Sequence, residues 1–465
     1  MKKSASTLII PVETQVREMD AKILLSCVAA ERGFTVIMGS RAFIHYQVAS
    51  FPRGVYLAKS LRTLSIRMFK ILRQLGHEIV AWDEEGLQRW PDPEYYRQRL
   101  SPVTMAQTSH LLAWGPDNAR AFRDYPGYHG APIHLTGNPR IDLIRPELRE
   151  YYRPQVDVLN KRYGDFVLVN TNFGLVNHFY SELGYLKKAA ESETPGAAFP
   201  YDAGKGRHKL ALFNCFQKTL PALCAAVADR TVVLRPHPSE NQAVWHAIAE
   251  HCPNMRVVNE GSITPWLMSA KVVVANGCTS LVESAVLGTP AIAYQPVTSE
   301  KFDDDMPNSL CHRAFSVDEL CLTTRAMVAG ELGALDNSVR RKILDQHIAA
   351  LDGPLAADRM VTVLEAAGYD RQQPPAARIS DYIRGWLNNT MRTRKKRRNM
   401  RRPGHRNNIA FHDHRFPAIS VEEIRDRIAR FGRLVNRFNN IRVEQHSQHI
   451  FSIRSMAVNE KPMSV

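Results

Sequence analysis

The sequence predicts an α/β protein with two doubly wound domains in tandem and a basic C-terminal extension. In the first 150 residues, short apolar runs such as Leu8–Val12 alternate with stretches of helical periodicity. A second series of the same kind opens at Phe166–Asn170 and continues to Ala291. This alternation is typical of parallel sheets with helices on both faces. Two such series in one chain therefore predict two Rossmann-like domains.

The length of the chain supports this division, because 465 residues exceed what a single hydrophobic core usually organises. The predicted domains are residues 1–155 and residues 156–370, joined by a charged helical linker over 147–163. Residues 371–465 form the predicted basic extension, with helices that can pack back on the body.

The composition is typical of a soluble protein, and we expect a cytoplasmic location. Hydrophobic residues make up 44% of the chain and charged residues 23%. The seven cysteines include no CxxC pair, so we expect reduced thiols, without disulfides and without a metal such as zinc. The apolar stretch near the N-terminus is shorter than a signal peptide core, and no run is long enough to span a membrane.

The net charge of +15 is concentrated in the tail. Residues 381–465 hold 19 Lys and Arg against 7 Asp and Glu, so 12 of the 15 excess charges lie there. The densest block contains Arg394, Lys395, Lys396, Arg397, Arg398, Arg401 and Arg402. It fits a solvated run, a nucleic-acid patch or a patch for an anionic inner-membrane surface. Aromatic residues are not interleaved with the block, which argues against nucleic acid as a partner.

Polar residues follow two apolar strands of the second series, where an open α/β sheet binds its ligand. The strand Thr231–Leu234 ends in Arg235-Pro-His237-Pro238, whose prolines fix the histidine in one orientation. An imidazole held beside an arginine suits a phosphate group. A histidine that caps a loop is the alternative.

The strand Val272–Ala275 leads through a small-residue turn into a helix start, which is a common anion site. The candidate ligands there are Asn276, Gly277, Thr279, Ser280 and Glu283. Hydroxyl and amide groups suit a phosphate, and the carboxylate suits ribose hydroxyls. An ordinary helix cap with a solvated glutamate is the alternative.

In the first series, Asp83-Glu84-Glu85-Gly86 follows the apolar strand Ile79–Trp82. Adjacent carboxylates raise each other's pKa, which can leave one of them as a base or nucleophile. A plain acidic turn is the alternative. Four further residues follow strands and face the expected cleft with uncertain roles: Glu13, Asn138, Asn170 and Asn172.

Together these motifs resemble the GT-B glycosyltransferases that use CMP-activated acidic sugars, which include bacterial sialyltransferases and Kdo transferases. Those enzymes carry an acidic-acidic-Gly, an His-Pro and a Ser/Thr motif. A closer resemblance is to bacterial surface carbohydrate (polysaccharide) biosynthesis proteins. It rests on Thr136-Gly-Asn-Pro-Arg-Ile-Asp, Val169-Asn-Thr-Asn-Phe-Gly, the Thr279 to Glu283 segment and Arg415-Phe-Pro-Ala-Ile-Ser. It covers most of residues 5–435, excluding the basic block, and implies two Rossmann-type domains facing a central cleft.

The resemblance implies transfer of Kdo or another nonulosonic acid from a CMP-sugar to a surface polysaccharide or lipid-linked glycan. Glu84 or Glu85 would be the catalytic carboxylate, and Asp83 is the next candidate. His237 would contact the CMP phosphate or assist its departure, and Thr279 and Ser280 would hold it. No bound cofactor or metal is implied, and the sequence does not decide between retaining and inverting routes.

Three other functions remain open. A CDP-glycerol or CDP-ribitol phosphotransferase also releases CMP, but it typically needs a second histidine as base in the first domain. A GT-B-like sugar-nucleotide epimerase is favoured only if a free UDP-sugar binds. A basic nucleic-acid-binding protein with a degenerate enzyme body would show steeply salt-dependent RNA affinity.

Overall fold

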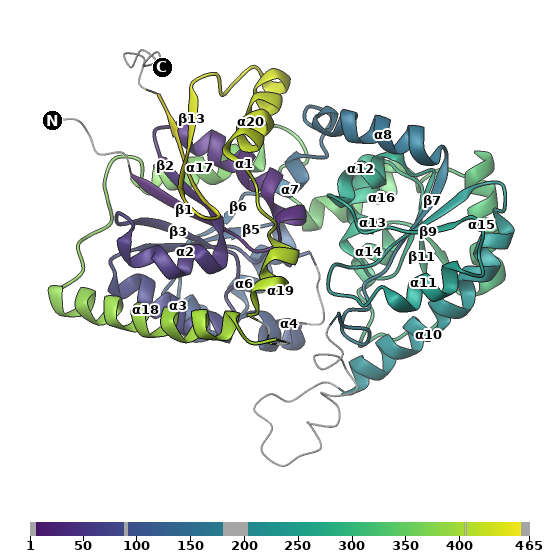
Figure 1. Ribbon diagram of the computed structural model, residues 1–465, viewed down its shortest axis with the longest axis horizontal. Coiled ribbons are helices and arrows are strands. Elements are labelled where there is room, and N and C mark those ends of the chain that lie inside the picture. Colours follow the sequence, from purple (N-terminus) through teal and green to yellow (C-terminus); the bar gives the residue numbers. More distant parts are fainter. Residues whose placement is uncertain (1–5, 88–91, 180–202, 404, 406, 457–465) are drawn as a thin grey trace. The chain divides into compact units, whose positions relative to one another are not determined.

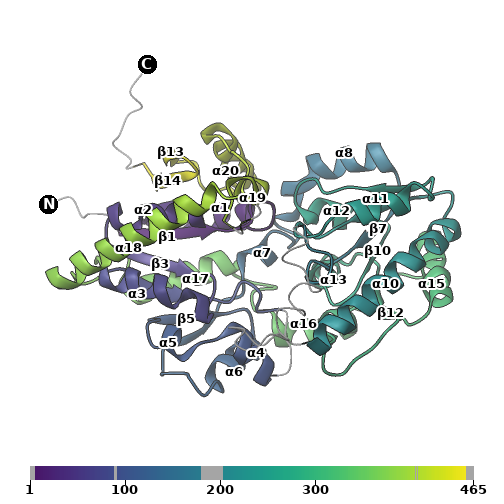
Figure 2. The same cartoon turned by 60° about the horizontal axis from the view of Figure 1, so that its bottom comes forward.

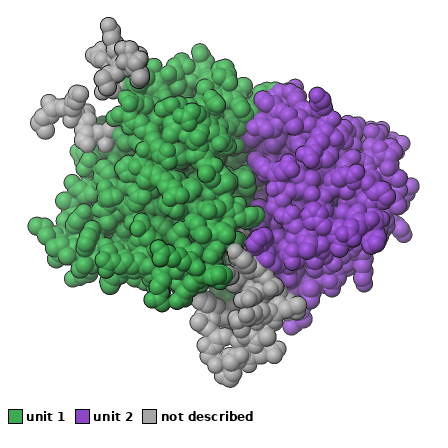
Figure 3. All heavy atoms as spheres, in the orientation of Figure 1, with its two compact units in different colours: residues 1–87, 92–151, 345–465 green, residues 88–91, 152–344 purple. Residues whose placement is uncertain are grey.

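The computed structural model describes residues 6–87, 92–179, 203–403, 405 and 407–456. The chain divides into two compact units, coloured separately in Figure 3. The first unit contains residues 1–87, 92–151 and 345–465, and the second contains residues 88–91 and 152–344.

The first unit is built on an eight-stranded sheet with the order β13-β14-β2-β1-β3-β4-β5-β6. Six of its strands are parallel, and the β13–β14 hairpin adds an antiparallel edge next to β2 (Figure 1). The strand order reverses beside β1, so the ligand crevice of such a sheet lies at the carboxyl ends of β1 and β3. The strands are β1 (Thr7–Val12), β2 (Thr35–Ser40), β3 (Gly54–Ala58), β4 (Glu78–Ala81), β5 (His110–Ala113), β6 (Ile133–Leu135), β13 (Ile441–Ser447) and β14 (Ile450–Ser455).

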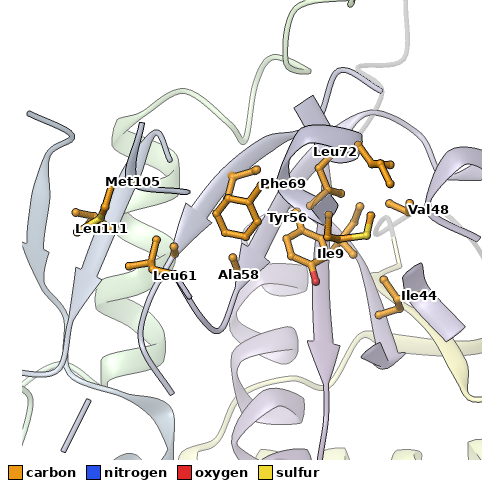
Figure 4. Packing of buried hydrophobic residues seen from close by; sticks show 14 of the residues in the cluster. Ile9, Ile44, Val48, Tyr56, Ala58, Leu61, Phe69, Leu72, Met105 and Leu111 are labelled. Atoms are coloured by element: carbon orange, nitrogen blue, oxygen red, sulfur yellow. The ribbon is translucent and has the colours of Figure 1, made fainter. Parts of the chain in front are cut away.

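Helices cover both faces of this sheet. On one face, α1 is buried along most of its length because its sequence is rich in Ala, Leu, Ile and Val, and it packs against α17 and α20. On the other face, the apolar side of α3 supplies Phe69 and Leu72, which pack against Ile9 and Tyr56 of the sheet (Figure 4). The helices of this unit are α1 (Gln15–Glu31), α2 (Arg41–Gln47), η1 (Val48–Ser50), η2 (Thr63–Ser65), α3 (Ile66–Gln74), α4 (Asp92–Arg99), α5 (Pro102–Met105), α6 (Pro116–Arg123), α7 (Pro139–Asp142), η3 (Arg149–Tyr152), α17 (Ala356–Ala366), α18 (Ile379–Met400), α19 (Ile409–Arg415) and α20 (Val421–Val435).

The C-terminal segment is an integral part of this unit. Helix α20 is amphipathic, and Ile424, Ile428 and Phe431 are buried on its apolar face. The Phe431 ring stacks on Tyr151 with centroids 4.2 Å apart. The partition differs from the expected boundaries, because residues 345–370 group with the first unit and not with the second. The C-terminal segment packs on the first unit because its helices α17 and α20 bury one face of α1.

The second unit has a six-stranded parallel sheet with the order β12-β11-β10-β7-β8-β9. Its first strand, β7, is central, and the order reverses between β7 and β10, as in a dinucleotide-binding fold. The strands are β7 (Phe166–Asn170), β8 (Thr231–Arg235), β9 (Met255–Val257), β10 (Val272–Ala275), β11 (Ala291–Tyr294) and β12 (His312–Ala314). The helices are α8 (Arg153–Tyr163), α10 (Ala203–Ala226), α11 (Ala243–Ala249), α12 (Ile263–Ser269), α13 (Thr279–Leu287), α14 (Asp305–Ser309), α15 (Val317–Ala329) and α16 (Asn337–His347).

The predicted fold class, α/β with two Rossmann-type domains, is confirmed. Each unit has its own parallel sheet and its own buried apolar cluster. Among the described residues, no helix combines the length and the apolar character needed to cross a membrane.

Pairing of β14 with β2 requires a glycine at position 39. A Cβ atom added to Gly39 would lie 2.1 Å from the carbonyl oxygen of His449, which itself accepts from the Ser40 amide at 2.9 Å. We expect Gly39→Ala to lower the free energy of unfolding by about 1–3 kcal/mol, as overpacking does. The measurement is urea unfolding followed by circular dichroism.

Gly333→Ala is the control, because an added Cβ there meets nothing within 4 Å. It should change the free energy of unfolding by less than about 0.5 kcal/mol. Equal unfolding midpoints for wild type and Gly39→Ala would contradict the observed pairing of the C-terminal hairpin.

Candidate functional site

Asp83, the first carboxylate of the acidic motif, is part of the protein interior. Its side chain is buried and accepts hydrogen bonds from Arg99 Nε at 3.0 Å and from the Tyr95 hydroxyl at 3.1 Å. The Trp114 indole donates to its backbone carbonyl at 2.7 Å. These contacts give Asp83 a structural role in anchoring the loop after β4.

Glu84 is also buried, and its carboxylate is enclosed by neighbours. It accepts from the Trp82 indole at 3.0 Å and lies 3.3 Å from Lys22 Nζ. Lys22 is itself buried in α1 and pairs with Glu18 at 2.8 Å. This internal ion-pair group fixes the loop and leaves Glu84 little access to a substrate.

Glu85 is the carboxylate of the three that reaches solvent, since its side chain is 28% exposed and pairs with Arg17 at 3.4 Å. Burial alone would raise its pKa, but the charges of Arg17 and Arg99 lower it to about 2. The expectation that neighbouring carboxylates raise the pKa is therefore wrong for Glu85. A carboxylate with such a low pKa is a weak base, so it accepts a proton poorly, but it can act as a nucleophile or stabilise positive charge.

Glu13 lies at the point where the strand order of the first unit reverses, directly after β1. Its carboxylate contacts Lys59 at 3.2 Å, Arg41 at 2.9 Å and Arg415 at 3.2 Å. Burial opposes ionisation, but these cations lower the pKa of Glu13 to about 2. The three cations were not selected from the sequence, although Arg41 and Lys59 each follow directly after a strand.

Asn138 follows β6 and caps the short helix α7. Its side-chain oxygen accepts the backbone amide of Arg140 at 3.0 Å, in the ordinary manner of an N-cap. This contact supports the plain-turn alternative for Asn138.

In the second unit, the loops after β7 and β10 meet at the switch point. The Asn172 side-chain amide donates to the carbonyls of Asn276 and Gly277 at 3.1 and 3.2 Å. Gly277 has a φ of +51°, and its amide donates to Asn308 Oδ1 at 2.8 Å. The two sequence motifs are thus brought together as the sheet topology predicts.

At this switch point, the described residues leave a helix start uncapped and two buried polar side-chain atoms without a hydrogen-bond partner. Cys278 precedes α13 without capping it through its side chain, so the first-turn amides of Thr279 and Ser280 lie at an uncapped helix start. Within the described residues, the buried Ser280 Oγ and Asn170 Nδ2 have no hydrogen-bond partner. Uncapped amides and orphaned donors are what an anion requires. Glu283, predicted to bind ribose, lies buried in the same helix.

His237 is held in one orientation, as its flanking prolines predicted. Its Nδ1 accepts the backbone amide of Ser239 at 3.2 Å and lies 2.7 Å from Ser239 Oγ. Because Nδ1 is an acceptor, the neutral ring carries its proton on Nε2. The ring and Pro238 are both partly exposed at the end of β8.

Glu240 is the residue that fixes this arrangement, and the sequence did not single it out. Its buried carboxylate accepts from Thr171 Oγ1 at 2.9 Å, from the amides of Phe173 and His237 at 2.9 and 3.0 Å, and from the Trp245 indole at 3.1 Å. Burial raises its pKa, although these hydrogen bonds oppose the shift. A glutamate three residues after the histidine was the available signal.

Arg235 does not take the role that its position suggested. Its two terminal nitrogens donate to the carbonyls of Glu260 and Gly261 at 2.8 and 3.0 Å, and its guanidinium lies over the Trp266 ring. Burial lowers its pKa to about 9. Arg235 therefore holds the loop after β9, and these nitrogens do not face a phosphate at the switch point.

Lys209 is a cation of the second unit that the sequence analysis missed. Its Nζ donates to Asn172 Oδ1 at 3.4 Å, so it lies beside the switch-point loops. Burial lowers its pKa, while Asp304 and Cys278 act in the opposite direction. It belongs to helix α10, and nothing in a helix marks such a residue as part of a strand-end site.

The basic block forms the second half of α18 and the turn after it. Arg394, Lys395, Arg397, Arg398, Arg401 and Arg402 are exposed, as expected for a surface patch. Lys396 is half-buried and donates to Asn407 Oδ1 at 3.0 Å. The helix lies alongside α3 in both ribbon views (Figures 1 and 2).

The described part of the chain contains one group of potential metal ligands, His412, Asp413 and His449. Both ring nitrogens of His412 are already hydrogen-bonded, to Ser40 Oγ at 2.8 Å and to Asp413 at 2.9 Å. A metal ion would have to displace these bonds.

No family model matches the sequence, and no curated protein matches it. Among solved structures, the chain is similar to an S. aureus MnaA–UDP co-structure, at 11% identity and a TM-score of 0.49 over 80% of this chain and 100% of that one. A putative UDP-N-acetylglucosamine 2-epimerase from Listeria monocytogenes gives 13% identity and a TM-score of 0.48 over 81% and 100%. The wall teichoic acid polymerase TagF gives 9% identity and a TM-score of 0.49 over 78% and 88%. At such identities and TM-scores the likeness assigns no activity to this chain.

The role of Glu240 can be tested by Glu240→Gln. Glutamine offers one acceptor oxygen where four donors converge, so buried donors lose their partners at about 1–3 kcal/mol each. We expect a lower urea midpoint, together with changed NMR chemical shifts of the His237 ring because the loop that orients it loosens. Glu250→Gln, at an exposed glutamate of the same unit, is the control. If Glu240→Gln kept the wild-type urea midpoint and the wild-type NMR signals of His237, as the control should, Glu240 would not hold the loops after β7 and β8 in place.

Proposed function

We propose that this protein is a GT-B-type glycosyltransferase that moves an acidic sugar from a CMP-sugar to a surface glycan or its lipid-linked precursor. The observation that carries the proposal is the group of unpartnered donors at the switch point of the second unit. A sheet of this order binds nucleotides at that edge, and buried donors without partners indicate a missing anionic ligand.

The CMP phosphate is proposed to lie at the start of α13. The first-turn amides of Thr279 and Ser280 would donate to it, and the Ser280 hydroxyl would gain a partner, which it lacks among the described residues. Lys209 and His237 would supply cationic and Nε2–H contacts to offset the charge of departing CMP. Neither bound cofactor nor metal is part of this proposal.

The carboxylate of the reaction is proposed to be Glu85, because Asp83 and Glu84 are buried and engaged. In the reaction, an acceptor hydroxyl bonds to the anomeric carbon, the bond from that carbon to the CMP phosphate oxygen breaks, and the hydroxyl proton passes to water. A carboxylate with a pKa of about 2 accepts a proton poorly. Glu85 therefore suits a double displacement, in which it first bonds to the anomeric carbon and the acceptor oxygen then replaces it.

The donor can be identified by thermal shift with CMP, CDP, UDP and GDP. CMP should stabilise the wild type and Glu85→Gln equally, and should stabilise Lys209→Met much less. Stabilisation by UDP alone would overturn the CMP-sugar donor in favour of an epimerase. Turnover of CDP-glycerol would instead support the phosphotransferase, and steeply salt-dependent RNA binding would support the non-enzymatic alternative.

Catalysis is tested by release of CMP from CMP-Kdo in the presence of acceptor glycans. Glu85→Gln should lower turnover by about a hundredfold or more, the usual size of such an effect, and leave CMP binding unchanged. Asp124→Asn, at a half-exposed carboxylate of the same unit, is the control. Full activity of Glu85→Gln would show that Glu85 is not the catalytic carboxylate.

We also propose that α18 holds the protein on an anionic membrane surface. The first half of this helix exposes large apolar side chains at helical spacing: Ile379, Tyr382, Ile383, Trp386, Leu387 and Met391. Ile379 is 81% exposed and Trp386 is 49% exposed. The basic block continues the same helix, so apolar contact and attraction to anionic lipids would act together.

Membrane association is tested by co-sedimentation with vesicles that contain phosphatidylglycerol. Replacing Trp386 and Leu387 by serine should reduce the bound fraction severalfold, because about 0.8 kcal/mol is lost per buried methylene group. Val339→Ser, at an apolar residue of α16 with 49% exposure, is the control. Unchanged sedimentation of the double variant, or of a variant with the block's arginines replaced by glutamine, would refute the proposal.

A further inference from the structure

A small basic pocket lies wholly within the first unit and was not anticipated from the sequence. It is a cavity of about 90 Å³ that opens beside the carboxyl ends of β1 and β2. The C-terminal segment closes it, because α18 contributes Arg392 and Lys396 and α19 contributes His412 and Arg415. Residues just over 400 positions apart in the chain thus line one cavity.

The charges around the pocket do not balance. Arg41, Arg392, Lys396 and Arg415 line it, and Glu13 is the carboxylate among its lining residues. Glu13 already accepts from Arg41 at 2.9 Å and from Arg415 at 3.2 Å. The lining therefore carries an excess of three positive charges before any ligand binds.

The neighbouring histidine does not change this balance. His45 is buried, and its pKa lies well below its usual value because of burial and the charges of Arg392 and Arg41. Its Nε2 is 2.6 Å from the Tyr56 hydroxyl. The imidazole is therefore neutral at physiological pH and adds no charge to the lining.

Two guanidinium groups of the pocket keep buried nitrogens without protein partners. Within the described residues, Arg392 Nη1 and Arg415 Nε are buried and have no hydrogen-bond partner. Arg392 Nη2 lies 3.4 Å from His45 Nδ1, which is a long contact. A buried charged donor without a partner is costly, and an oxyanion between these arginines would remove that cost.

We propose that this pocket binds a phosphate monoester group. Its small volume, about 90 Å³, and its arginine and lysine lining suit a compact oxyanion such as a phosphate group. A doubly charged anion matches the excess of positive charge better than a single carboxylate does, and arginine forks suit phosphate oxygens. The inference does not depend on the identity of the sugar donor, because every residue that lines the pocket belongs to the first unit.

The test uses the full-length protein and inorganic phosphate, titrated calorimetrically at constant ionic strength. Arg392→Gln and Arg415→Gln should each weaken phosphate binding at least tenfold. Arg123→Gln, at an exposed arginine of the same unit, should bind as the wild type does. Equal affinity in the wild type and both pocket variants would overturn the proposal.

Folding and donor binding are checked in the same variants. Arg392→Gln and Arg415→Gln should keep the wild-type circular dichroism spectrum and the wild-type thermal shift with CMP. If CMP bound to none of these proteins, the proposed donor would be refuted and the pocket proposal would be unaffected. Loss of phosphate binding in the two variants, with CMP binding retained, would support the pocket.

The source of the phosphate group is resolved by two further ligands. Glycerol 3-phosphate represents a soluble monoester, and vesicles containing phosphatidic acid represent a lipid headgroup, with phosphatidylglycerol vesicles as the diester control. A preference for phosphatidic acid that disappears in Arg392→Gln would support a lipid source, and Arg392-dependent binding of glycerol 3-phosphate alone would support a soluble one. Binding of both without any dependence on Arg392 or Arg415 would refute the pocket.

Discussion

Lys22 lies in the most deeply buried helix of the first unit, and its charge has to be neutralised inside the protein. Its ammonium group donates to Glu18 and to the Pro11 carbonyl, both at 2.8 Å, and lies 3.3 Å from Glu84. A buried ion pair is weakly stabilising in itself, but removing one partner leaves an uncompensated charge. The loop after β4 is therefore tied to α1 and to the end of β1. Glu85 projects from that loop, so its position depends on this internal pairing.

The second unit also contains a buried charged group that needs partners, but there the charge is negative. There the buried charge is the carboxylate of Glu240, and neutral donors from the loops after β7 and β8 converge on it. The carboxylate sets the backbone that carries His237. In the same unit, Ser280 and Asn170 keep donors that have no acceptor in the described part of the chain. The polar groups that have hydrogen-bond partners hold the loops of the candidate site in place. The donors without partners indicate where a ligand would bind.

The C-terminal segment contributes both to the stability of the first unit and to its candidate binding sites. It covers α1 through α17 and α20, extends the first sheet through β14, and carries Arg392 and Arg415 to the strand ends. Its exposed helix α18 has an apolar half followed by a basic half. Because these contacts belong to one stretch of chain, the segment cannot be treated as a detachable basic tail.

The sequence by itself determined the two α/β units and the strand ends at which polar residues gather, because hydrophobic periodicity and turn residues are local properties. Only the tertiary structure decided the rest. It separated exposed Glu85 from buried Asp83 and Glu84, turned Arg235 toward the loop after β9 and brought Lys209 to the switch point. It also returned residues 345–465 to the first unit. Burial, pKa and long-range pairing depend on what the fold places around a side chain, and neighbours distant in sequence leave no local pattern.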